Sequence, residues 1–436
     1  MNYIPNILFA VALALGIGYF VKNVKKLVRN IKLGQDVDVS DHKDQRWQNM
    51  IRIALGQGKM VRRPVAGILH IIVYLGFIII NIEVLEIILD GLTGKHRLFS
   101  FMGGFYGFLI GSFEILAFLV FVSVVIFWIR RNIIKLQRFW KPEMTSWPKN
   151  DANFILYFEM VLMTLFLVMN ATDPHFQEMQ SGNVISQFIS PLFSGASEGT
   201  LHVIERSAWW LHILGILVFL NYLYFSKHLH ILLAFPNTYF GKVKPKGAFN
   251  NLEAVTAEVK MMMDPDADPY AMPEEGADEE VPAKFGASDV QDLSWVQLLN
   301  AYTCTECGRC TSECPANLTG KKLSPRKIMM DTRDRLEEVG KNIDANNGEF
   351  KDDGKQLLGD YISHEEIWAC TTCNACVEAC PVSIDPLSII LEMRRYLVME
   401  QSAAPMELNN MMSNIENNGA PWPYNQMDRL NWVDEN

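Results

Sequence analysis

Five long apolar segments alternate with strongly charged connectors in the first half of the chain. They lie at residues 3–21, 65–89, 105–129, 154–171 and 208–225. Because about 20 apolar residues cross the hydrocarbon core of a bilayer, each segment is predicted to be a membrane-spanning helix. The first segment has no basic residue before it and four after it, so it is expected to be a retained anchor and not a cleaved signal peptide.

The second half of the chain has a different pattern, with amphipathic helical periodicity from Trp295 onward. Ser324 followed by Pro325 predicts a helix start, and Pro386 predicts another. The fold class expected is therefore all-α: a five-helix transmembrane bundle followed by a second, α-helical domain. The expected divisions are a transmembrane domain at 1–240, an acidic linker at 241–290, the second helical domain at 291–400 and a C-terminal tail at 401–436.

The linker is rich in Pro, Gly and acidic residues, as in the runs that begin at Asp264 and Glu274. Such a composition predicts little core of its own. A Ca²⁺ site is the alternative interpretation of these acids, but the ordered ligand spacing of an EF-hand is missing.

Basic residues are distributed unevenly between the connectors. Residues 22–63 contain eleven Lys and Arg and residues 130–150 contain six, whereas residues 172–205 contain none. Because basic residues near helix ends favour the cytoplasmic side, the N-terminus is expected outside and the second half of the chain in the cytoplasm. The overall net charge of −10 conceals this asymmetry. No nucleic-acid partner is expected.

All eight cysteines occur in two matching runs, each of the form C-x2-C-x2-C-x3-C-P. This spacing is typical of two [4Fe-4S] clusters, in which the fourth cysteine of each run ligates the other cluster. The helical domain at 291–400 is therefore expected to be a cytoplasmic α-helical ferredoxin domain that binds two [4Fe-4S] clusters. One predicted ligand set is Cys304, Cys307, Cys310 and Cys380. The other is Cys370, Cys373, Cys376 and Cys314. Structural zinc fits two complete four-cysteine runs poorly, and no further cysteine remains for disulfides.

Histidines in the membrane half suggest a second kind of metal centre. On one continuous fifth helix, His212 and His230 would lie five turns apart on the same face. His70, near the cytoplasmic start of the second helix, would lie at the depth of His230. We therefore predict a bis-histidine haem b between His70 and His230, with His228 turned away from it. A second haem on His212 is left open, because the second helix offers no histidine at that depth. The outer-loop residues His96, His175 and His202 are alternative ligands for it.

Four carboxylates within the spans are candidates for proton transfer to a quinone, because buried charges in a membrane are costly. They are Glu83, Glu86, Glu114 and Glu159. The alternative is a structural role, in which they pair with Arg206 or with backbone donors.

Several motifs together resemble the membrane iron–sulfur oxidoreductases related to heterodisulfide reductase. They are the run Arg62 to His70, the runs Trp209 to His212 and Phe225 to His230, Pro236–Asn237, the two cysteine runs and the stretch Asn414 to Trp422. The resemblance implies a cytochrome b similar to the nitrate reductase gamma subunit, joined to a helical two-cluster ferredoxin. It also implies electron transfer with menaquinone, in some relatives from electron-transferring flavoprotein. One departure is that the gamma-type cytochrome has two histidines on its second helix, whereas this chain has only His70 there.

The function predicted is a membrane electron-transfer subunit of a quinone-linked respiratory oxidoreductase, multi-pass in the bacterial inner membrane. No nucleotide fingerprint or nucleophile motif is visible in the sequence, so the subunit is expected to be incomplete without a partner. By resemblance, the partner is a separate heterodisulfide-reductase-like cysteine-rich subunit or an electron-transferring flavoprotein. The acidic linker and the charged helix from Arg326 to Glu338 are expected docking surfaces. The competing hypothesis is a membrane polyferredoxin that acts in metal handling or haem–copper oxidase assembly, which would not need the histidine pair.

Overall fold

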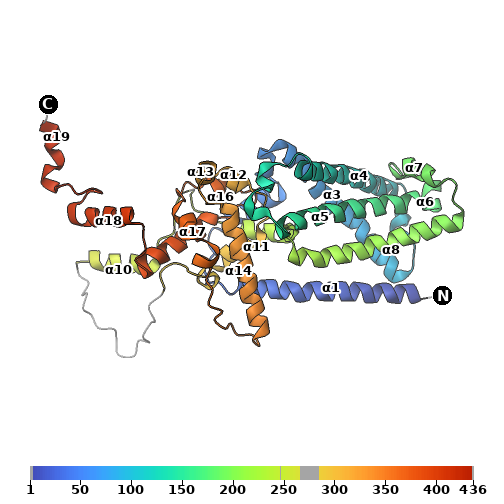
Figure 1. Cartoon of the computed structure of the whole chain (residues 1–436). Coiled ribbons are helices and arrows are strands. Elements are labelled where there is room, and N and C mark those ends of the chain that lie inside the picture. Colours follow the sequence, from blue (N-terminus) through green and yellow to red (C-terminus); the bar gives the residue numbers. More distant parts are fainter. Residues whose placement is uncertain (1–2, 246, 266–283, 435–436) are drawn as a thin grey trace.

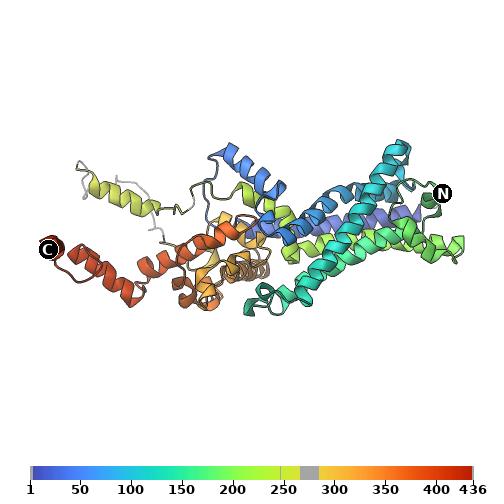
Figure 2. The same cartoon turned by 90° about the horizontal axis from the view of Figure 1, so that it is seen from above.

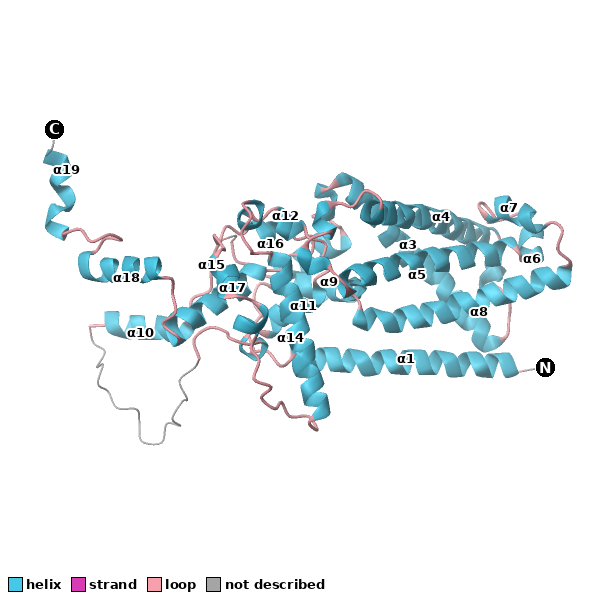
Figure 3. Ribbon diagram, viewed as in Figure 1, coloured by secondary structure: helices cyan, strands magenta, loops and turns pink. Residues whose placement is uncertain are grey.

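The computed structural model describes residues 3–245, 247–265 and 284–434. Within these residues the chain is built from helices and loops (Figure 3), and strand-like pairing is limited to two isolated bridges, Gln35–Ser294 and Leu358–Ile362. The all-α class predicted from the sequence is confirmed.

Five of the described helices are long and apolar enough to cross a membrane. They are α1 (Ile4–Ile31), α3 (Pro64–Thr93), α4 (Gly104–Asn132), α5 (Trp147–Ala171) and α8 (Glu198–Tyr222). Helices α3, α4, α5 and α8 form a bundle with α1 along one side (Figures 1 and 2). The short helices α6 (Pro174–Glu178) and α7 (Ser186–Ile189) follow α5 at the far end of this bundle.

The fifth apolar segment does not continue as one helix to His230. Helix α8 ends at Tyr222 and is followed by two short 3₁₀ turns, η7 (Leu223–Phe225) and η8 (Lys227–Leu229), before α9 (His230–Tyr239) begins. Ser226 between the turns has an extended backbone and accepts a hydrogen bond from the His228 N–H. The expectation that His212 and His230 share one helical face is therefore wrong, because it assumed an unbroken helix.

The cysteine runs lie among short helices packed around one long one. These are α11 (Trp295–Thr303), α12 (Arg309–Ser312), α13 (Pro315–Leu318), α14 (Pro325–Ala345), α15 (His364–Trp368), α16 (Ala375–Ala379) and α17 (Pro386–Arg395). The Ser324 side chain caps α14 by accepting from the Lys327 N–H, and Asp385 caps α17 in the same way through Ser388. Both predicted helix starts are confirmed.

The remaining helices lie outside these two groups. Helix α2 (Lys43–Met50) packs beside α9, and α10 (Glu253–Met263) lies within the expected linker. Residues 266–283, which carry most of the acidic runs, lie outside the described residues. At the other end of the linker Ala287 is fully buried in the hydrophobic core. Helices α18 (Met406–Asn418) and α19 (Asn431–Asp434) extend away from the bundle (Figure 1).

The membrane helices and the cysteine-bearing helices meet at a polar contact region, which we call the membrane–cluster interface. The end of α1 binds α14 through the ion pairs of Lys26 and Arg29 with Asp344. The backbone of Gln35 exchanges two hydrogen bonds with Leu293 and Trp295. Further pairs join the connectors to the cysteine runs: Arg62 with Glu378, Arg63 with Glu313, Glu143 with Arg326, and Lys227 with Glu306.

Candidate metal centres

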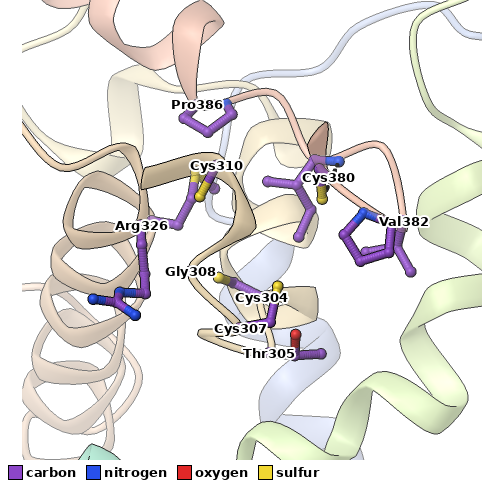
Figure 4. Close-up of a pocket in the computed structure, with 12 residues that line it drawn as sticks. Cys304, Thr305, Cys307, Gly308, Cys310, Arg326, Cys380, Val382 and Pro386 are labelled. Carbon is purple, nitrogen blue, oxygen red and sulfur yellow. Dashed lines mark hydrogen bonds between the residues drawn. The ribbon is translucent and has the colours of Figure 1, made fainter. Parts of the chain in front are cut away.

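The eight cysteines line two separate cavities, and each cavity combines cysteines from both runs. The first cavity is lined by Cys304, Cys307, Cys310 and Cys380 (Figure 4). The second cavity is lined by Cys314, Cys370, Cys373 and Cys376. All eight thiols are free of disulfides. The four thiols of each predicted ligand set therefore lie around the same cavity.

The two cysteine runs share a local backbone geometry. In each run the second and fourth residues after the first cysteine have positive φ: Glu306 at 54° and Gly308 at 71°, and Thr372 at 55° and Asn374 at 59°. Only glycine adopts this conformation freely, although asparagine tolerates it. A Cβ on Gly308 would lie 2.6 Å from a guanidinium nitrogen of Arg326, so the close approach also requires glycine. Sequence reasoning missed this repeat, for which the Gly308–Asn374 correspondence was the available signal.

Burial controls the protonation of the thiols. It raises the pKa of Cys304 to about 12 and the pKa of Cys380 to about 11. Without a metal these side chains are therefore protonated at neutral pH. Because only thiolates bind iron, the positive charge of a metal has to displace the protons.

Two histidines from different helices face each other. The ring centroids of His70 on α3 and His230 on α9 lie 6.3 Å apart. His230 Nδ1 lies 3.1 Å from the Lys227 carbonyl oxygen, which it reaches as a donor, so its Nε2 is left available. Burial lowers the pKa of His230, which favours the neutral imidazole that binds metals.

His228 also belongs to this buried histidine cluster. Its ring centroid lies 5.4 Å from that of His230, and its Nε2 lies 3.6 Å from a carboxylate oxygen of Glu159. Burial lowers the pKa of His228 to about 3.

His212 lies in the interior of the bundle, away from the break in the fifth segment. Its Nδ1 lies 3.0 Å from the Leu162 carbonyl oxygen, and its buried Nε2 has no hydrogen-bond partner among the described residues. The other expected ligands for an outer centre are on the surface: His175 and His202 are exposed, and His96 binds Asp173 at 3.0 Å.

The four candidate carboxylates have different surroundings. Glu114 accepts hydrogen bonds from Asn170 and two backbone N–H groups, and Glu86 accepts from Tyr106 and one backbone N–H. Both therefore have the backbone donors of the structural alternative. Glu83 is buried, and its Oε2 has no partner in the described part of the chain.

The expected partner of these acids, Arg206, binds its neighbour Glu205 instead. The buried guanidinium of Arg97 instead binds the side chains that donate to Glu86 and Glu114. It donates to Tyr106, Asn170 and Asp173.

A buried ion network connects the histidine cluster with the first cavity. Lys227, whose carbonyl binds His230, forms an ion pair with Glu306 in the loop between Cys304 and Cys307. Glu306 also binds Arg333 at 2.8 Å. Asp151 of α5 lies 3.7 Å from Lys227. Sequence reasoning missed this network because its members are far apart along the chain.

Two arginines of the charged helix α14 are not available to a docking partner. Arg326 and Arg335 are fully buried. Arg335 binds Asp289 at 2.7 Å and Asp353 at 2.6 Å, and Arg326 binds Glu143 at 2.6 Å. The expectation that this helix presents its charges to a partner is wrong for these two residues, since each is satisfied within the chain.

Sequence comparison agrees with the geometry of the cysteine cavities. A family model described as a 4Fe-4S dicluster domain matches residues 303–384, which contain both runs. The chain is therefore a membrane protein with an iron–sulfur electron-transfer domain, homologous to the membrane iron–sulfur oxidoreductases related to heterodisulfide reductase.

Individual relatives show which members of this class the chain is similar to. The chain is 30% identical to the probable iron-sulfur-binding oxidoreductase FadF of Bacillus subtilis, over 98% of the chain and 61% of the relative. It is 26% identical to the EtfAB:quinone oxidoreductase of Syntrophomonas wolfei, over 92% of the chain and 55% of the relative. A shorter match, 36% identical over 24% of the chain and 52% of the relative, is to one component of a CoB-CoM heterodisulfide reductase of Methanosarcina acetivorans. The chain thus spans little more than half the length of the first two relatives. No solved structure matches it.

Proposed function

We propose that this chain is the membrane electron-transfer subunit of a quinone-linked oxidoreductase in the bacterial inner membrane. It passes electrons between a cytoplasmic donor or partner subunit and menaquinone, through two [4Fe-4S] clusters and haem b. The observation that carries the proposal is the facing pair His70 and His230, joined through Lys227 to the loop of the first cavity.

Each cavity fits one cluster. Cys304, Cys307, Cys310 and Cys380 would hold one, and Cys370, Cys373, Cys376 and Cys314 the other. When bound, such clusters supply one-electron transfer. The four thiols of each cavity provide the full ligand set that a [4Fe-4S] cluster needs, and the positive-φ residues turn each run around its cavity.

The histidine pair fits a bis-histidine haem. Two imidazoles that hold one metal at about 2 Å from each nitrogen have ring centroids about 6 Å apart, close to the 6.3 Å between His70 and His230. The hydrogen bond from His230 Nδ1 to Lys227 fixes the tautomer that leaves Nε2 as the ligand. The unpartnered Nε2 of His212 supports a second metal centre, for which the spans offer no second histidine at that depth.

The basic connectors and the anchored cysteine helices support an outside N-terminus and cytoplasmic clusters. Two relatives support the choice of partners, since one is named for EtfAB and quinone and another belongs to a heterodisulfide reductase. An electron-transferring flavoprotein or a separate heterodisulfide-reductase-like subunit is therefore the proposed partner, and menaquinone the proposed substrate.

The optical spectrum of the purified protein tests the histidine pair. We expect a low-spin haem b spectrum that is lost in His70→Ala and in His230→Ala but kept in His228→Ala. The three residues share one buried cluster, so His228→Ala controls for loss of packing. If neither His70→Ala nor His230→Ala changes the reduced-minus-oxidised spectrum, the cytochrome proposal fails and a role in metal handling or oxidase assembly takes its place.

A further inference from the structure

The two cysteine cavities differ in the charge of their surroundings. Arg326 lines the first cavity, whereas none of the described residues that line the second cavity carries a charge. The cavities are otherwise alike in ligand number and in loop geometry. Such a difference in surrounding charge would give the two clusters different reduction potentials.

Arg326 is buried with one donor unused. Its side chain is fully buried and lies beside Cys310, Cys307 and Gly308 (Figure 4). One terminal nitrogen donates to the Arg138 carbonyl oxygen at 2.5 Å, and the other donates to Glu143 at 2.6 Å. Its Nε–H is buried and has no partner within the described ranges. A buried donor without a partner is costly unless another group at the site accepts from it.

Other cations reinforce the charge at the first cavity. Arg309 is buried and donates to the carbonyl oxygens of Lys59 and Met60, which are neutral acceptors. Along the chain Arg309 lies between Cys307 and Cys310. Arg138 packs against Gly308 in the wall of the cavity, and its buried Nε has no partner among the described residues.

The anions nearby are already matched by cations. Glu143 pairs with Arg326, and Glu306 pairs with both Lys227 and Arg333. The charges of Arg309 and Arg138 remain in excess, so the described surroundings of the first cavity are net positive.

The second cavity has a nearly balanced environment. Arg394 approaches Cys370, but its donors are taken up by the carbonyl oxygens of Ile367 and Cys370. On the other side the Asp385 carboxylate caps α17, whose Leu387 and Ile390 line the cavity. One cation is thus opposed by one anion.

Charge of this kind acts directly on a cluster. A cluster with four thiolate ligands is anionic, and reduction adds one further negative charge, so hydrogen bonds and net charge around it set its potential. Buried cations are screened much less than exposed ones. The exposure of Cys373 to solvent also favours a reduced cluster, but the three other thiols of that cavity are buried or half-buried. The cation excess at the first cavity therefore dominates.

We propose that Arg326, Arg309 and Arg138 hold the cluster of the first cavity at a higher reduction potential than the cluster of the second cavity. The inference rests on the proposed function, in which each cavity holds one cluster. Transfer between them oxidises the second cluster by one electron and reduces the first by one electron, with no bond made or broken. Electrons therefore run from the exposed side of Cys373 toward the membrane, which assigns the chain the direction from soluble donor to quinone.

An EPR-monitored redox titration of the anaerobically purified full chain tests this order. In Arg326→Gln, with iron content unchanged, the midpoint of the first-cavity signal should shift to a more negative value and the other signal should stay in place. Glu143→Gln should shift the same signal in the positive direction, because it removes the matching anion. Arg394→Gln, the matched control, should shift only the second signal. Signals are assigned with Cys314→Ser, which disturbs the second cavity.

The possible outcomes separate the two proposals. Iron content far below two clusters would refute the proposed function itself. The inference alone would be overturned if both clusters are present but the midpoint potential of the first-cavity cluster is equal to or below that of the second-cavity cluster. It would also be overturned if Arg326→Gln does not shift the midpoint potential of the first-cavity cluster. If Arg326→Gln loses the first-cavity cluster, Arg138→Gln and Arg309→Gln are measured instead. Each should shift the midpoint potential of that cluster to a more negative value, and an unchanged midpoint would contradict the inference.

Discussion

Cys314 lies in the first cysteine run but lines the cavity that contains the first three cysteines of the second run. Pro315 directly after it begins α13, which fixes the direction in which the chain leaves the cysteine. A ligand set is therefore not equivalent to a sequence run.

A substitution at this position has a testable consequence. Cys314→Ser should damage the cluster that Cys370, Cys373 and Cys376 hold, because that cluster loses its fourth thiolate. The cluster of its own run should keep four ligands and its EPR signal. Quantitative EPR of the reduced protein measures both. Loss of the Cys304 cluster instead would contradict the crossed arrangement, and Cys380→Ser should give the reciprocal result.

Individual residues also show the limits of sequence reasoning. The cysteine grouping depends on local spacing, which is visible in the sequence. The meeting of His70 and His230 was predicted from helix phase, although the helix breaks at Tyr222 and a different geometry brings the rings together. The roles of Glu306 and Lys227 were not predictable, because their pairing depends on contacts between distant segments.

At the scale of elements, the break between α8 and α9 is the feature that joins the two halves of the molecule. Lys227 lies in the break, where its carbonyl binds His230 and its ammonium binds Glu306. A continuous helix would have engaged that carbonyl in an intrahelical bond. The sequence indicated an apolar segment here but gave no strong breaker, since the interruption occurs at Ser226 and not at a proline.

Removal of this lysine should weaken the attachment of the cluster helices. Lys227→Met leaves the buried Glu306 and Asp151 with less compensation, which is expected to cost roughly 3 kcal/mol of stability. The double variant Lys227→Met/Glu306→Gln should lose less than the sum of the single variants. Denaturant unfolding in detergent measures the differences. Lys322→Met, which breaks an exposed pair with Glu365, should have little effect. An equal loss in both lysine variants would argue against the network.

At the scale of the whole molecule, the membrane bundle and the cysteine helices form one continuous arrangement (Figures 1 and 2). The number, order and approximate bounds of the spans followed from hydropathy, because a bilayer imposes a length on each helix. The packing of the cysteine helices on the connectors did not follow from hydropathy. It depends on ion pairs between distant segments, such as Arg63 with Glu313, which a hydrophobic periodicity does not predict.

This arrangement predicts what the isolated protein can do. Menaquinol should reduce the proposed haem, whereas electron transfer between quinone and a soluble carrier should require an added cytoplasmic partner. Stopped-flow spectroscopy of the haem bands, with and without the partner, measures both reactions. Direct reduction of menaquinone from a nicotinamide by the isolated chain would contradict the prediction.

The ion pairs and backbone bonds of the membrane–cluster interface have one more consequence. They attach the cysteine helices to the end of α1 and the segment after it, to the segment before α3, to the connector between α4 and α5, and to the segment after α8. A redox domain tethered at so many places does not swing between donor and acceptor. The distances between its metal centres are therefore fixed by the fold. The rate of electron transfer between these centres should not fall in a viscous solvent, whereas the rate of association with a soluble partner should.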